Sequence, residues 1–175
     1  MRKALTIVLL TLGLAVPPLT LAAALAPSTA EAAVTPTRAE RRVLAAINRE
    51  REAADLAKLG FKPALMRAAR AHTRDMAARC VLTHTGGDGS SVSERLREFG
   101  YGSSGYSSWK VGETIAAAPT GTGFAKPAAI VALWMGSPGH LDVLLTPGFR
   151  DVGVGIVYGD DGMRYFTVDF GRRIK

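Results

Sequence analysis

Residues 152–170, with the sequence VGVGIVYGDDGMRYFTVDF, decide the fold class of this chain. Val152, Val154 and Ile156 alternate with glycines, and from Phe166 to Phe170 every second residue is apolar. This alternation is the period of a β-strand, and the turn residues 159–162 lie between the two runs. The segment therefore predicts an antiparallel hairpin that closes the chain. The two alternating glycines further indicate that another element packs very close to the first strand.

The chain before this hairpin has mainly the 3.6-residue period of helices. Capping boxes begin two of the expected helices, one at Thr37 to Glu40 and the other at Ser91 to Glu94. The order of elements, helices first and a hairpin last, predicts an α+β fold rather than parallel βαβ winding. We expect helices at 37–59, 63–80, 91–100, 127–135 and from Ser137 onward, with a short strand at 111–116.

The first residues have the pattern of an export signal. Arg2 and Lys3 precede two apolar stretches, and Ala30-Glu31-Ala32 matches an A-x-A cleavage site. We therefore expect a signal peptide over 1–32, a tether over 33–39 and a single domain over 40–175. No later stretch reaches the roughly 18 apolar residues of a membrane span. The predicted protein is secreted, either free or associated with the cell envelope.

Composition limits the partners and the source of stability. The formal net charge is +7, so anionic envelope polymers, lipids or another extracellular protein are the candidate partners. We expect no nucleic-acid partner and a monomer. Cys80 is the only cysteine, which excludes an internal disulfide and predicts a buried, inert thiol near a helix end. The charged run 49–52 is interpreted as the solvated face of the first helix.

The three histidines differ in their predicted surroundings. His72 falls on or beside an apolar helical stripe, which predicts a hydrogen-bonded core residue. His84 lies in a Gly/Asp/Thr loop, where side chains are free to take part in a site. His140 lies in the first turn of a helix with Ser137 as N-cap and Pro138 at its first position. The positive end of the helix dipole favours the neutral ring there.

Two of these histidines could act together with Glu113, which lies between loops rather than on a charged helix. His84, His140 and Glu113 could form a His₂Glu metal set with an open position for water. They could equally form an acid–base pair oriented by the carboxylate. The spacing leaves both alternatives open.

The HExxH motif of the zincins is absent, and residues 135–139 do not match GxSxG, with Ser137 expected to be occupied as a cap. Residues 100–105 match GxGxxG but follow a helix, which argues against nucleotide binding.

Several short motifs occur in the order typical of one known family. They comprise Ile47 to Arg51, Ala71 to Ala77, Thr83-His84-Thr85, Asp88-Gly89, Arg95 to Tyr101, Gly112-Glu113, Trp134 to His140 and Val152 to Gly155. Together they cover about residues 40–171. In this order the chain resembles the CAP superfamily, which comprises cysteine-rich secretory proteins, antigen 5 and pathogenesis-related 1 proteins, and it is most similar to the short bacterial members.

The resemblance implies an α-β-α sandwich with a small antiparallel central sheet and a large cleft. It also implies that His84, Glu113 and His140 converge in that cleft. Many relatives have a second glutamate shortly before the last histidine, and here that neighbourhood holds Gly136 and Ser137. Metal binding at the histidines and sterol or lipid binding occur in parts of the family, and no single reaction is general to it.

These observations predict an exported CAP-domain protein that binds a divalent metal, with Zn²⁺ as the expected ion and His84, His140 and Glu113 as its ligands. The same three residues are the catalytic candidates of an alternative, a hydrolase in which water attacks. A third hypothesis is a carrier of apolar ligands, with loops 101–108 and 117–126 shaping the entry. The simplest interpretation is structural, with the two histidines hydrogen-bonded across the layers. Whether the protein is an enzyme stays open.

Overall fold

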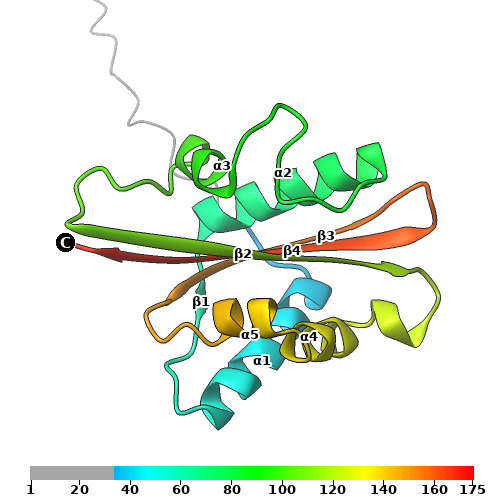
Figure 1. Cartoon of the computed structure of the whole chain (residues 1–175), viewed down its shortest axis with the longest axis horizontal. Helices are drawn as coiled ribbons and strands as arrows, with labels where there is room; N and C mark the ends of the chain where they lie inside the picture. The colour runs from blue at the N-terminus through cyan, green and yellow to red at the C-terminus, as the bar shows by residue number, and fades with distance from the viewer. Residues whose placement is uncertain (1–33) are drawn as a thin grey trace, which may run out of the picture. The chain divides into compact units, whose positions relative to one another are not determined.

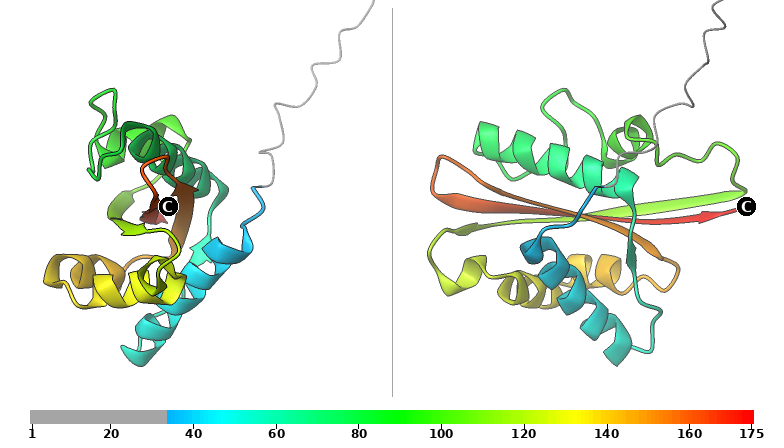
Figure 2. Two further views of the ribbon diagram at one scale, coloured as in Figure 1. Left: turned by 90° about the vertical axis from the view of Figure 1, so that its right-hand side faces the viewer. Right: turned by 180° about the vertical axis from the view of Figure 1, so that it is seen from behind.

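The structure is a computed structural model that describes residues 34–175, and it contains three layers. Helices α2 and α3 lie on one face of a four-stranded sheet, and the other helices lie on the opposite face (Figures 1 and 2). This α-β-α arrangement confirms the expected fold. The elements are α1 (Arg38–Ala53), β1 (Gly60–Phe61), α2 (Pro63–Arg79), α3 (Val92–Glu98), β2 (Ser108–Pro119), η1 (Gly123–Ala125), α4 (Pro127–Met135), α5 (Pro138–Leu144), β3 (Asp151–Tyr158) and β4 (Met163–Ile174).

The sheet has the order β1-β3-β4-β2. The predicted hairpin is confirmed, because β3 and β4 pair antiparallel from Asp151↔Gly171 to Tyr158↔Arg164. β2 is longer than expected, since it pairs with β4 along its whole length, from Ser108↔Ile174 to Pro119↔Met163. The two-residue strand β1, which the sequence did not predict, pairs parallel with β3. β2 is thus an edge strand, and the site described below forms on it.

Helix α2 packs directly on the backbone of β3, as the alternating glycines predicted. A Cβ atom at Gly153 would lie 2.1 Å from the carbonyl carbon of Leu65. A Cβ atom at Gly155 would lie 2.4 Å from the carbonyl oxygen of Ala69. Any side chain larger than hydrogen would therefore push the helix away from the sheet.

Two predictions about helix ends are wrong. Helix α1 ends at Ala53 rather than near Leu59, because Asp55 adopts the left-handed conformation (φ 56°) and closes the helix. The amides of Asp55 and Leu56 donate to the carbonyls of Glu52 and Arg51, the bonding pattern of a Schellman motif. Cys80 was expected to be buried but is exposed, because it follows the last turn of α2 as a left-handed C-cap (φ 52°).

The charged run 49–52 is not entirely solvated, because Arg51 is fully buried. Its guanidinium donates to the carbonyls of Ala57, Leu144, Thr146 and Phe149. These hydrogen bonds satisfy backbone carbonyl groups in the segment after α1, at the end of α5 and in the loop between α5 and β3. Arg51 is therefore a structural residue that ties α1 to the segment leading into the sheet.

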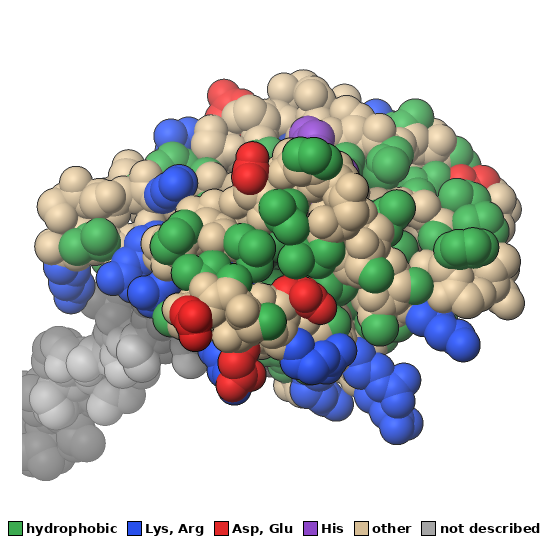
Figure 3. Space-filling model, turned by 60° about the horizontal axis from the view of Figure 1, so that its bottom comes forward, with side chains coloured by type: hydrophobic (Ala, Val, Ile, Leu, Met, Phe, Trp, Pro, Cys, Tyr) green, Lys and Arg blue, Asp and Glu red, His purple; other side chains and the backbone are tan. Residues whose placement is uncertain are grey.

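The helices α1, α4 and α5 cover the main hydrophobic core. Trp134 is fully buried, and its indole N–H donates to the carbonyl of Ile115 in β2 at 3.0 Å. Hydrophobic side chains also lie on the outside of this layer, with Lys and Arg at its margin (Figure 3). Phe124 in η1 and Leu133 in α4 are 74% and 59% exposed.

Within residues 34–175 no helix is long and apolar enough to cross a membrane, and the expected signal at 1–32 lies outside the described residues.

Candidate functional site

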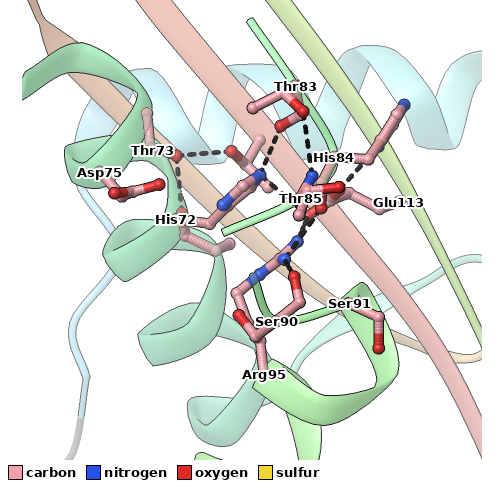
Figure 4. A network of polar contacts seen from close by, with 12 residues as sticks. His72, Thr73, Asp75, Thr83, His84, Thr85, Ser90, Ser91, Arg95 and Glu113 are labelled. Atoms are coloured by element: carbon pink, nitrogen blue, oxygen red, sulfur yellow. Dashed lines mark hydrogen bonds and ion pairs between the residues drawn. The ribbon is translucent and has the colours of Figure 1, made fainter. Parts of the chain in front are cut away.

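The candidate site is built around Glu113 in the edge strand β2. Glu113 pairs across the sheet with Asp169 of β4, on the face that α2 covers. The loop after α2 brings His84 to Glu113, and α3 brings Arg95 to it (Figure 4). We call the group formed by Glu113, His84, Arg95 and His140 the edge site.

Both carboxylate oxygens of Glu113 are bonded within the protein. The Nδ1–H of His84 donates to Oε1 at 2.7 Å, and Arg95 Nη2 donates to Oε2 at 2.7 Å. The Glu113 side chain is 1% exposed, whereas that of His84 is 53% exposed. Burial alone would raise the pKa of Glu113, but the His84 hydrogen bond and the Arg95 charge outweigh it and lower that pKa. Glu113 is therefore an ionised carboxylate that fixes the orientation of an exposed imidazole.

Arg95 holds this arrangement together. Besides Glu113, its guanidinium donates to the carbonyls of His84 at 2.9 Å and Ser90 at 3.0 Å. It thus fixes both the carboxylate and the backbone of the loop that carries His84. Arg95 is 6% exposed, on a helix that begins with the predicted capping box at Ser91. The sequence does not indicate that Arg95 belongs to the site, because an arginine on a short surface helix gives no signal of burial.

His72 is the core histidine that the sequence predicted. It is 1% exposed, and its Nε2 is 2.9 Å from the carbonyl oxygen of Thr83. Burial is the main cause that lowers the pKa of His72, so the ring is neutral. Its Nε2 also lies 3.8 Å from Glu113 Oε2. His72 thus supports the start of the loop that carries His84.

Asp169 is a second buried carboxyl group beside Glu113, and it was not predicted from the sequence. It is 1% exposed, and its Oδ1 has no hydrogen-bond partner among the described residues. Burial, followed by the charge of Glu113, raises its pKa well above the usual range. The pair therefore holds a neutral Asp169 beside an ionised Glu113. The signal in the sequence is an aspartate within a strand whose two faces are both covered.

This pair predicts a pH-dependent effect of Asp169→Asn. A raised pKa means that the contribution of Asp169 to stability is fully present below the pKa of the unfolded chain and is lost as pH rises toward the folded pKa. Asparagine does not ionise, so the variant should gain in melting temperature relative to the parent as pH rises from about 4 to about 7. Paired thermal melts across this range test it. A difference between the two proteins that stays constant with pH would contradict the assignment.

His140 approaches the edge site from the opposite face of the sheet, in the first turn of α5. Burial and the nearby His84 ring lower its pKa, which favours the neutral form that the sequence predicted. Its Nδ1 is enclosed and has no hydrogen-bond partner among the described residues. Helix α5 begins at Pro138 as expected, but the Ser137 hydroxyl makes no cap hydrogen bond. The expectation that capping occupies this hydroxyl is therefore wrong.

The geometry limits what the edge site can bind. Within residues 34–175 no three His, Cys, Asp or Glu side chains are arranged to hold a metal ion, so a ready-made His₂Glu set is not present. A pocket of about 290 Å³ lies next to the site and shares Arg95 with it. His72, Asp75, Arg95 and Phe99 contribute to its walls, whereas neither His84 nor His140 does. His84 and His140 are therefore not part of this pocket.

Comparison with known proteins identifies the family. The model of the cysteine-rich secretory protein family, CAP, matches residues 44–170. The chain belongs to the CAP family. The protein YkwD of Bacillus subtilis is 33% identical to this CAP protein over 118 residues, a match covering 67% of this chain and 42% of YkwD. The chain thus spans about two fifths of the length of this curated relative.

Solved structures share the CAP fold. An outer surface protein of Borrelia burgdorferi aligns with a TM-score of 0.63 at 21% identity, covering 76% of this chain and 91% of that one. The structure of NaASP2, solved with Zn²⁺, aligns with a TM-score of 0.52 at 11% identity, covering 78% of this chain and 83% of that one. These matches support the fold that the resemblance implied.

Proposed function

We propose that this chain is an exported CAP protein that binds a divalent cation, with zinc as the expected ion, through His84 and His140. The observation that carries the proposal is the bond from His84 Nδ1–H to Glu113. A carboxylate that accepts from one ring nitrogen fixes the tautomer and leaves the other nitrogen as an electron-pair donor. His84 presents this nitrogen on a ring that is 53% exposed.

The second histidine fits the same role. The lowered pKa of His140 favours its neutral ring, which lies close enough to His84 for the two rings to influence each other. Neutral imidazoles are good zinc ligands. A bound ion would act as a Lewis acid on groups brought to it. In this proposal Glu113 orients His84 rather than ligating, because both of its oxygens are already bonded.

Export and an extracellular role are parts of the same proposal. They are supported by the signal pattern over 1–32 and by the structural likeness to an outer surface protein. The Zn²⁺ in the NaASP2 structure supports the choice of ion. The hydrolase alternative has less support, because neither His84 nor His140 lines the pocket next to the site. The apolar-carrier alternative has less support as well, because the pocket on loop 101–108 contains two arginines.

Zinc titration of the purified protein tests the proposal. Every protein in the series should carry Cys80→Ser, because the exposed thiol would otherwise bind zinc itself. We expect calorimetry to give at least tenfold weaker binding for His84→Ala/His140→Ala. Glu113→Gln should weaken binding by about 10- to 100-fold through loss of the orienting carboxylate. Equal affinity of the parent and the double histidine variant would contradict the proposal.

A further inference from the structure

A separate pocket lies where the loop between α3 and β2 meets the end of the sheet. This loop runs beside the C-terminus at the end of β4 (Figure 1). The pocket has a volume of about 360 Å³, within the range of small-molecule sites. Its walls are formed by Arg97, Arg173 and loop residues Gly100, Gly102, Ser103 and Ser104. We call it the arginine pocket.

Both guanidinium groups of this pocket make cation–π contacts with aromatic rings. Arg97 lies over the Trp109 ring at 4.6 Å from its centroid. Arg173 contacts two rings, Tyr101 at 4.3 Å and Tyr106 at 4.5 Å. A guanidinium stacked by its face keeps its N–H groups along its edge, where they remain free to donate. Both arginines are thus oriented before a ligand arrives.

The rings themselves are fixed by the fold. Tyr101 is fully buried, and its hydroxyl donates to Asp151 Oδ2 at 2.6 Å. The ring packs on the backbone of Gly171, where a Cβ atom would lie 2.4 Å from it. Trp109 lies opposite Arg173 in the β2–β4 register. Two neighbouring strands and α3 therefore set the positions of the two arginines.

The charge of the pocket is positive. No acidic residue lines it, and neither arginine forms an ion pair among the described residues. Arg97 makes one long contact, 3.4 Å to the Ser93 hydroxyl. The nearby carboxylate of Asp151 is already bonded to Tyr101. The two guanidinium groups are therefore available to an anion.

We propose that the arginine pocket binds a phosphoryl group. A tetrahedral oxyanion accepts hydrogen bonds from several directions, which suits two guanidinium edges with the neighbouring Ser103 and Ser104 hydroxyls. Arginine is the residue best suited to two-point recognition of phosphate. The Gly100–Gly105 motif takes part through its backbone shape, since Gly100 and Gly105 both have positive φ. This site is independent of the cation proposed at the edge site.

Tryptophan fluorescence during titration with inorganic phosphate, at constant ionic strength, tests this proposal. Trp109 contacts Arg97, whereas Trp134 is fully buried in the core, so a ligand in the pocket should perturb Trp109. We expect a saturable change in the parent protein. Affinity should fall at least tenfold in Arg97→Gln/Arg173→Gln and also fall in Arg97→Lys/Arg173→Lys, which keeps the charge but loses the planar fork.

The matched control is Arg42→Gln/Arg49→Gln, which removes the same charge from the exposed face of α1. It should change the affinity less than twofold. Dimethyl phosphate in place of phosphate distinguishes the sources: comparable binding assigns the site to a phosphodiester, and binding of phosphate alone assigns it to a free or terminal phosphate. Absence of saturable binding to the parent, unchanged affinity in Arg97→Gln/Arg173→Gln, or an equal loss in the α1 control would overturn the proposal.

Discussion

Replacing Arg95 by leucine should lower the free energy of unfolding by about 3–5 kcal/mol. The substitution leaves Glu113 as a buried charge without its cationic partner, next to the buried carboxyl of Asp169. It also removes the donors to the carbonyls of His84 and Ser90. Removing one member of a buried ion pair costs more than the pair itself contributes, because the remaining charge is still desolvated. Denaturant unfolding monitored by circular dichroism measures the loss.

Two further variants test whether this loss of stability comes from the Arg95–Glu113 ion pair. Arg95→Leu/Glu113→Gln should be less destabilised than Arg95→Leu alone, because the second change removes the stranded charge. Arg42→Leu, at an exposed site on α1, should stay within about 0.5 kcal/mol of the parent. If the double variant is as unstable as the sum of its parts, Arg95 and Glu113 are not coupled as described.

Gly153→Ala should destabilise the protein by about 3 kcal/mol or more, at the upper end of the range for overpacked cores. The added methyl group would lie 2.1 Å from the carbonyl carbon and 2.2 Å from the carbonyl oxygen of Leu65. Both atoms belong to the backbone of α2, so no rotamer change relieves the clash and the helix must move. For a domain of this size we expect the melting temperature to fall by about 10 °C.

Gly60→Ala is the matched control, since it lies in the same sheet with nothing within 4 Å of its added Cβ atom. Its melting temperature should stay close to that of the parent. Unchanged melting of Gly153→Ala would mean that α2 does not pack on β3 as closely as the structure indicates.

The features that the sequence predicted well are those with a local cause. The β3–β4 hairpin follows from alternation and a turn, and both capping boxes form because Thr37 and Ser91 bond to glutamates three residues away. The close approach of α2 was predictable because only glycine leaves room for it. Helix α4 has the expected bounds, since Pro127 begins it and Gly136 follows it.

The features that the sequence missed depend on partners far away along the chain. The acceptors of buried Arg51 include the carbonyls of Leu144 and Phe149, which are 93 and 98 residues away. The short strand β1 exists only because β3 lies beside it. Arg95 and Asp169 are buried because α2, α3 and the sheet enclose them together. The meeting of His84 with Glu113 was expected from the family resemblance, and spacing alone did not predict it.

The central claim is that Glu113 fixes the tautomer of His84 and leaves Nε2 bare for a ligand. The chain contains three histidines, so long-range ¹H–¹⁵N spectra of histidine-labelled protein, with His84→Ala and His140→Ala for assignment, report on each ring. In mildly alkaline buffer without metal we predict that His84 carries its proton on Nδ1 and that Glu113→Gln weakens this preference. A His84 ring protonated on Nε2 in the parent protein, or a tautomer unaffected by Glu113→Gln, would contradict the account.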